Sequence, residues 1–269
     1  MREQRLVFGE DPELYDRSRP GYSDEVVQDV LDFGGLDPGA CRALEIGAGT
    51  GKATVAFARR GVGVLALEPD PAMAAVAARN GAPYPGVAVR VCSFEDWELE
   101  HGAFDLVFSA QAWHWVRPEV RSARAAAALV PGGCLALMWH RVRWPSDDPV
   151  RAAMDDCYRR YAPELHARGP GFPGLGPNGI AERTEAELEG CGSLGGIVVH
   201  EHPWTQSMDA ALYVDRLRTQ SDHRLLDPAE LERLLDAVRD VVMANGGSVT
   251  VPHSTLVVMA RRERETSRG

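Results

Sequence analysis

The chain has 269 residues, of which 45% are hydrophobic, and its 39 acidic against 29 basic residues give a formal net charge of −10. This length fits one enlarged α/β domain or a domain with an appendage, and the hydrophobic content excludes a disordered chain. The acidic surplus repels phosphate backbones and anionic lipid, so neither nucleic acid nor a membrane surface is expected as a partner.

The five cysteines and the N-terminus bear on the cellular compartment. The number of cysteines is odd and no two form a C-x-x-C pair, which argues against a disulfide framework or a zinc knuckle. The first twenty residues are charged where a signal peptide would be apolar, and no apolar run approaches the roughly 18 residues of a membrane span. We therefore expect a soluble, cytoplasmic protein.

From the first apolar strand to residue 139, short apolar strands alternate with helical segments. A leading helix begins at Ser23, and later helices begin at Asp70-Pro71 and at Pro118. The strand segments show little alternation between polar and apolar residues, as expected for parallel strands covered on both faces. The expected strands are 42–46, 63–68, 87–92, 104–109 and 134–139.

The rest of the chain adds a helix at 149–161, a Gly/Pro-rich loop at 169–177, a strand at 196–204, two helices, and a last strand at 248–261. The second of the two helices is well marked, with Asp227 as N-cap, Pro228 at the first helical position and Glu230 completing a capping box. Two helices inserted before the last strand predict a lid at about 205–246.

Together these elements predict a doubly wound, Rossmann-like, mostly parallel seven-stranded sheet, with helices on both faces and a helical lid before the last strand. Residues 1–140 are expected to form a ligand-binding core with N-terminal helices. Residues 141–269 are expected to complete the same sheet and to carry the lid.

The segment Ala43-Leu44-Glu45-Ile46-Gly47-Ala48-Gly49-Thr50-Gly51-Lys52 is the most informative one, because a strand runs into glycines with a helix behind them. A phosphate-binding P-loop is excluded, since Ile46 stands at the first glycine position and Ala53 at the hydroxyl position. A dinucleotide fingerprint is weakened, since Lys52 takes the place of its third glycine. The pattern E-x-G-x-G-x-G instead resembles motif I of the class I S-adenosylmethionine (SAM) dependent methyltransferases.

Later segments support this resemblance. Glu68 closes the second strand 21 residues after Gly47, where an acid can accept both hydroxyls of a ribose. The segments 92–97, 104–111 and 129–135 resemble the motifs that follow in this class. The closer likeness is to its small-molecule branch, often called type 11, which includes trans-aconitate methyltransferase-like proteins. It depends on residues 15–22 and 111–115.

The resemblance implies SAM as cofactor and S-adenosylhomocysteine as product. Arg19, with Tyr15 beside it, is a plausible clamp for the methionyl carboxylate, although a surface ion pair would explain Arg19 as well. Trp113, Trp115 and Tyr22 could face the sulfonium cation, or could pack in the core. The cofactor residues expected in this way are Tyr15, Arg19, Glu45, Gly47, Ala48, Gly49, Glu68, Pro69, Ser93, Phe94, Glu95, Ala110 and Gln111.

Three histidines near the carboxyl edge of the expected sheet or in the lid could act as general base, because imidazole titrates near neutral pH. They are His114, His140 and His223, and a structural role stands as the alternative for each. No metal site is expected, since the ends of the fourth and fifth strands offer Ser109 and Trp139-His140 rather than carboxylates.

The predicted function is transfer of a methyl group from SAM to an O, N or C nucleophile of a small-molecule metabolite. The Asn/Asp-Pro-Pro-aromatic motif and the Pro-Cys pair of DNA methyltransferases are absent after the fourth strand. Two alternatives stay open: a SAM-fold protein with a non-methylating role, such as a pericyclase, a decarboxylase or a SAM-binding scaffold, and an NAD oxidoreductase. A monomer or a homodimer is expected.

Overall fold

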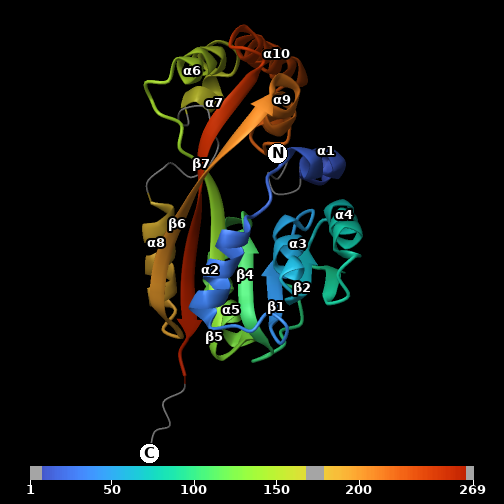
Figure 1. Ribbon diagram of the computed structural model, residues 1–269, viewed down its shortest axis with the longest axis vertical. Helices are drawn as coiled ribbons and strands as arrows, with labels where there is room; N and C mark the ends of the chain where they lie inside the picture. Colours follow the sequence, from blue (N-terminus) through green and yellow to red (C-terminus); the bar gives the residue numbers. More distant parts are fainter. Residues whose placement is uncertain (1–7, 168–178, 265–269) are drawn as a thin grey trace, which may run out of the picture. The chain divides into compact units, whose positions relative to one another are not determined.

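A computed structural model describes residues 8–167 and 179–264 (Figure 1). The Gly/Pro-rich loop expected at 169–177 lies outside the described residues. Within them, seven strands form one sheet in the order β3-β2-β1-β4-β5-β7-β6. The strands are β1 (Arg42–Ile46), β2 (Gly63–Glu68), β3 (Val87–Val91), β4 (Phe104–Ala110), β5 (Leu129–Val142), β6 (Leu194–Asp209) and β7 (Ser248–Arg262).

The sheet is mixed but mostly parallel. The pairs β1–β2, β1–β4, β2–β3 and β4–β5 are all parallel. Strand β7 is antiparallel to β6, because Ser207 at one end of β6 bonds Thr250 while Ser193, just before its other end, accepts from Glu263. The predicted seven-stranded, Rossmann-like fold with helices on both faces is confirmed.

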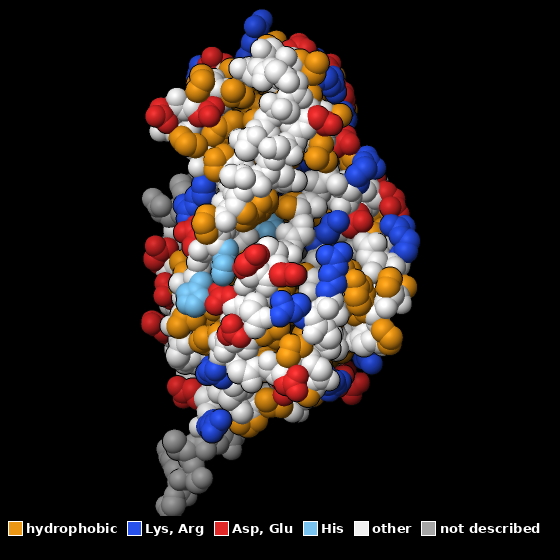
Figure 2. Space-filling model, in the orientation of Figure 1, with side chains coloured by type: hydrophobic (Ala, Val, Ile, Leu, Met, Phe, Trp, Pro, Cys, Tyr) orange, Lys and Arg blue, Asp and Glu red, His pale blue; other side chains and the backbone are white. Residues whose placement is uncertain are grey.

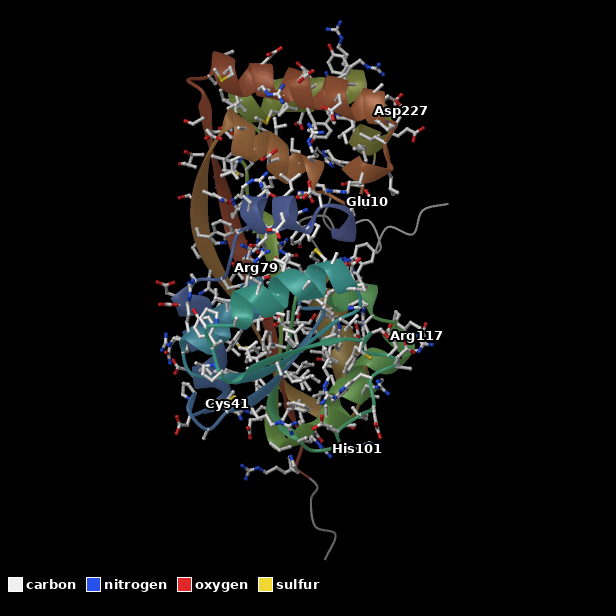
Figure 3. The ribbon with its side chains drawn as sticks, turned by 90° about the vertical axis from the view of Figure 1, so that its right-hand side faces the viewer. Glu10, Cys41, Arg79, His101, Arg117 and Asp227 are labelled. Atoms are coloured by element: carbon white, nitrogen blue, oxygen red, sulfur yellow. The ribbon has the colours of Figure 1, made fainter. Side chains whose placement is uncertain are left out.

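Most helices begin where a side chain caps the first turn. Ser23 accepts from the Val26 amide, and Asp70 accepts from the amides of Ala72 and Met73. Asp227, at the N-terminal end of α10 in Figure 3, accepts from two amides, but Glu230 returns no bond, so only half of the expected capping box forms. The α-helices are α1 (Pro12–Ser18), α2 (Asp24–Gly34), α3 (Lys52–Arg59), α4 (Pro71–Gly81), α5 (Pro118–Ala128), α6 (Pro149–Tyr161), α7 (Pro163–Ala167), α8 (Ile180–Gly190), α9 (Ala210–Arg218) and α10 (Pro228–Ala244), and the 3-10 turns are η2 (Phe8–Glu10), η3 (Trp113–Trp115) and η4 (His223–Leu225).

The described chain divides into two compact units. The core unit holds residues 20–139, 179–202 and 255–264, and the helical unit holds residues 8–19, 140–167 and 203–254. The segment expected as a lid, 205–246, lies in the helical unit together with α1 and α6.

In the core unit, alternate strand residues face two separate apolar layers. Leu44 and Ile46 of β1 pack with α5 and α8, whereas Ala43 of the same strand packs with α2 and α3. In β5, Leu135 and Leu137 join the first layer, while Cys134, Ala136 and Met138 join the second. Both faces of these strands are therefore buried, which accounts for the continuous apolar character of their sequences.

In the helical unit, the apolar stripe of α10 is the centre of the packing. Leu231, Leu234, Leu235, Val238 and Val242 are buried against residues of α6 and α9. Burial of each such side chain contributes roughly 1.5–3 kcal/mol. The stripe predicted from the helical spacing thus forms the core of this unit.

Candidate cofactor site

The glycine loop joins β1 to α3 and is held against the end of β2. The amides of Gly47 and Ala48 both donate to the carbonyl of Leu67, at 2.9 and 3.0 Å. Gly47, Gly49 and Gly51 have φ values of +71°, +59° and +83°, which a side chain rarely permits. The expected sharp turn between strand and helix is therefore present.

The loop that follows β4 packs directly on this turn. A Cβ atom added to Gly47 would lie 2.4 Å from the Cβ of Ala112. Gln111 has a φ of +60°, and its amide donates to the Met138 carbonyl at 2.9 Å. A non-glycine residue in this conformation is sparsely populated and is found most often where a site requires it. Ala110 and Gln111, both expected to contact the cofactor, thus adjoin the glycine loop.

Glu68, the last residue of β2, points its carboxylate into the glycine loop. One oxygen, Oε2, accepts from the Gly49 amide at 2.7 Å, and the other, Oε1, accepts from the Asp70 amide at 3.0 Å. Burial raises the pKa of Glu68, and these two amides act in the opposite direction. A carboxylate has about four acceptor sites, so it can also accept the two hydroxyls of a ribose.

Glu45 lies in the middle of β1 and is completely buried. Its Oε2 accepts from the hydroxyl of Thr54, but its Oε1 has no hydrogen-bond partner. The buried hydroxyl of Thr50 in the glycine loop likewise has none. Burial raises the pKa of Glu45 from its ordinary 4.5 to about 8, although the bond from Thr54 opposes the shift. Within the described residues, two buried polar atoms at the loop therefore lack a hydrogen-bond partner.

The shifted pKa of Glu45 leads to a prediction on stability. Between pH 4.5 and about 8, the folded protein keeps a proton on Glu45 that the unfolded chain has released, so this group stabilises the fold at low pH and loses that effect as pH rises. The Glu45→Gln variant does not titrate there. Its unfolding free energy, measured in urea, should rise relative to the parent by roughly 1 kcal/mol per pH unit from pH 5 to 8. Two parallel curves would contradict the assignment.

The segment after β3 carries Ser93, Phe94 and Glu95, which were expected to contact the cofactor. The Ser93 hydroxyl accepts from the Asp96 amide and lies 2.7 Å from the Asp96 carboxylate, so it shapes the turn. Phe94 is 3% exposed, and Glu95 accepts from the Arg117 amide at 3.0 Å. Pro69 is exposed after β2. These residues lie in the core unit with the glycine loop.

The residues present fit SAM better than a nucleotide with a pyrophosphate. Burial, and to a smaller extent the charge of Glu68, raise the pKa of Glu45 to about 8, so Glu45 is protonated and uncharged at pH 7. The Glu68 carboxylate at the loop would repel a pyrophosphate but attract a sulfonium or an ammonium group. Glu68 would hold the ribose, and the glycine turn gives the backbone room to approach the methionyl part.

The three histidines expected as general bases occupy different surroundings. His114 lies in η3, its ring lies 4.7 Å from that of Trp115 at an interplanar angle of 46°, and it hydrogen-bonds to no other described residue. His140 packs its ring edge on Trp204, 5.1 Å away. His223 is fully buried between Asp222, 2.9 Å from Nδ1, and the Tyr158 hydroxyl, 2.8 Å from Nε2. Only His114 belongs to the core unit, and the catalytic roles stay predictions.

Tyr15 and Arg19, expected to hold the methionyl carboxylate, lie in the helical unit. The Arg19 guanidinium lies over the Tyr15 ring, 5.0 Å from its centroid, as the sequence reading placed them together. Arg19 donates to the hydroxyl and carbonyl of Thr219 and to the Gln220 side chain. Among the described residues Arg19 forms no ion pair, and its role as a clamp stays a prediction.

Some residues that shape the site were not expected from the sequence. Arg121 of α5 donates to the carbonyl of Trp113 at 2.7 Å and pairs with Glu187 of α8, and it thus fixes the turn that carries His114. Trp113 itself is 1% exposed and belongs to the core. Thr54, the partner of Glu45, was also missed, because a contact nine residues apart leaves no local pattern.

Comparisons with known proteins find methyltransferases. The family described as a methyltransferase domain, of type 11, matches residues 44–137. An uncharacterized methyltransferase of Mycobacterium tuberculosis is 28% identical and covers 96% of this chain and 97% of its own length. A protein of Dictyostelium discoideum named as a methyltransferase is 31% identical over 132 residues, which are 49% of this chain and 48% of that protein.

Solved structures show the same fold. A methyltransferase from an antibiotic biosynthesis pathway of Anabaena variabilis has 19% identity and a TM-score of 0.61, over 90% of this chain and 98% of its own. The phosphoethanolamine N-methyltransferase 2 of Haemonchus contortus, solved with phosphomonomethylethanolamine and S-adenosylhomocysteine, has 16% identity and a TM-score of 0.57, over 98% of this chain and 61% of its own. Residues 44–137 match the methyltransferase-domain family, and together with the relatives and the fold this match supports a class I SAM-dependent methyltransferase.

Proposed function

We propose that the protein transfers the methyl group of SAM to an O, N or C nucleophile of a small-molecule metabolite. The supporting observation is the loop after β4, where Ala112 packs on Gly47 of the proposed cofactor loop and His114 follows two residues later. The close approach of Ala112 to Gly47 supports a role for this loop, and for His114 on it, beside the cofactor.

Methyl transfer is an in-line displacement, in which the acceptor attacks the methyl carbon and the sulfonium becomes neutral. SAM supplies the activated methyl group, so the protein contributes orientation and a water-poor site, with a base only where the acceptor loses a proton. Desolvation of the ring and the nearby Arg121 lower the pKa of His114 to about 4. Its imidazole is therefore neutral at pH 7 and can accept a proton or a hydrogen bond.

Several features favour a small acceptor over a nucleic acid. The net charge is −10, and on the face that Figure 2 shows, acidic and basic side chains are interspersed rather than gathered into a basic stripe. The end of β4 carries Ser109 and Ala110 in place of the motifs of DNA-modifying relatives. The helices α9 and α10, in the segment expected as a lid, are the part of the chain that we propose selects the acceptor.

The proposal also covers the cellular compartment, the dependence on metal and the oligomeric state. No helix in residues 8–167 and 179–264 is long and apolar enough to cross a bilayer. All five cysteines are free thiols, which supports the cytoplasm as the compartment. We propose a metal-independent reaction, and a monomer or a homodimer.

The test is incubation of the protein with SAM carrying a labelled methyl group and a metabolite extract. We expect label in a small acceptor, and a loss of turnover of about 100-fold in the His114→Asn variant. Because the pKa of His114 is about 4, the part of the rate that depends on it should stay level from pH 6 to 9 and fall only below pH 5. The His101→Asn variant is the control, since His101, labelled in Figure 3, is exposed in the turn before β4.

Three results would count against this proposal in different ways. Equal turnover in the His114→Asn variant would remove His114 from the mechanism. Label only in RNA, DNA or protein would contradict the small acceptor. SAM bound without any methylated product would favour the non-methylating alternative.

A further inference from the structure

Arg216 of α9 is a buried cation without an acidic partner in residues 8–167 and 179–264. Only 8% of its surface is exposed. Its Nη1 donates to the Gln206 side chain at 2.7 Å and lies 3.7 Å from the sulfur of Met208, and its Nη2 lies 3.0 Å from Nε2 of His253. No described residue accepts from Nε, and Arg216 is not among the residues with an inaccessible unpartnered atom, so its Nε–H is open to solvent or to a ligand.

The histidine beside it is neutral. Nδ1 of His253 lies 2.8 Å from the Val251 carbonyl, which can only accept, so the ring proton is on Nδ1 and Nε2 is the acceptor for Arg216. Burial, and after it the charge of Arg216, lower the pKa of His253 to about 4. The contacts of Arg216 are therefore all with uncharged groups.

A second guanidinium lies close by in the same unit. Arg19 donates only to Thr219 and Gln220, which are also uncharged. The hydroxyl of Thr219 accepts from Arg19 and donates to the Arg216 carbonyl, and so it links the two arginines. Burial and then the charge of Arg19 lower the pKa of Arg216 to about 10, which shows that the two cations repel each other.

The surroundings compensate only part of these two charges. The C-terminal carbonyls of α9 carry about half an elementary negative charge. The charge of Asp222 acts on Arg19, but its Oδ1 is bound to the amide and ring of His223. In the described chain no carboxylate lies within the 4.0 Å of an ion pair from either guanidinium. Buried charges in proteins are normally paired, so an anion is the missing partner.

We propose that Arg216, through its Nε–Nη2 edge, binds an oxyanion of the methyl acceptor, either a carboxylate or a phosphate. Such an anion has two oxygens whose separation matches that of the Nε and Nη2 donors. The rings of His253 and Trp204, stacked 4.3 Å apart, provide a flat neighbour for the body of the same molecule. That the anion belongs to the acceptor depends on the proposed function, whereas the anion site itself does not.

The test titrates the full chain by calorimetry with succinate, inorganic phosphate and, as a cationic control, ethanolamine. We expect millimolar binding of at least one anion and none of ethanolamine. The Arg216→Gln variant should lose at least 10-fold in affinity for the anion. Arg216→Lys keeps the positive charge but not the two parallel donors of the guanidinium, so it should lose less affinity. Arg218→Gln should bind as the parent does, because Arg218 on the same helix pairs with the exposed Glu232.

The outcomes are separable from those of the proposed function. SAM affinity, measured in each variant, should not change; if it falls in Arg216→Gln and no anion binds, Arg216 serves the cofactor and the proposal is wrong. Equal anion binding in the parent and Arg216→Gln, or none in the parent, also overturns it. A melting curve shows whether the Arg216→Gln protein is folded. If it is not, the anion affinity of Arg216→Lys is compared with that of the parent instead, because lysine can still donate to Gln206 and His253. A parent that binds an anion but not SAM would contradict the proposed function alone.

Discussion

Replacing Glu68 with alanine is expected to weaken SAM binding by roughly 100-fold. The carboxylate already accepts the amides of Gly49 and Asp70, which hold it at the glycine loop with further lone pairs available. Two hydrogen bonds from ribose hydroxyls to a charged acceptor are worth about 3 kcal/mol or more together, which corresponds to this factor. The measurement is calorimetric titration of SAM into each protein.

Three companion variants sharpen the result. Glu68→Gln keeps one carbonyl acceptor and should lose about 10-fold. Glu98→Ala removes an exposed acid and therefore changes the net charge by the same amount as Glu68→Ala. It should bind SAM as the parent does. Arg19→Gln tests the proposed clamp on the methionyl carboxylate in the same titration. Unchanged affinity in Glu68→Ala would refute the ribose assignment.

Where a local signal marks an element, its boundaries in the structure agree with the sequence to within a residue. The strands Arg42–Ile46 and Gly63–Glu68 and the helices that start after Ser23, Asp70 and Asp227 are of this kind, since caps and short apolar runs act within one turn. Strand β5 begins five residues before the predicted Cys134, because Pro131-Gly132-Gly133 reads as a turn although it lies within the strand. Helix α8 was not anticipated, since Gly179 at its N-cap gives no side-chain signal.

The residues of the site could be predicted only where the number of residues between two motifs determines where both lie in the sheet. Glu68 could be found because adjacent parallel strands end at the same edge, and the structure places it at the glycine loop. The close contact of Gly47 with Ala112, which lie 65 positions apart, depends on the register of β1 against β4. The burial of Arg216 was equally inaccessible, because a charged residue on an amphipathic helix is ordinarily exposed.

The Gly47→Ala variant is expected to lose about 3 kcal/mol of stability together with most SAM binding. About 1–2 kcal/mol of this is the cost of placing alanine at a φ of +71°. The remainder arises because the new Cβ would lie 2.4 Å from the Cβ of Ala112, so the cofactor loop or the loop after β4 must shift. Urea denaturation measures the first effect and calorimetry the second.

Two further variants separate the backbone cost from the steric cost. Gly61 has a φ of +93° with no heavy atom within 4 Å of an added Cβ, so Gly61→Ala should show the backbone cost alone. Ala112→Gly removes the colliding Cβ, and in combination with Gly47→Ala it should recover about 1–2 kcal/mol and part of the SAM affinity. Because the two loops belong to the same unit, this coupling should be present with or without ligand. Strict additivity of the two substitutions would show that the loop after β4 does not support the cofactor loop.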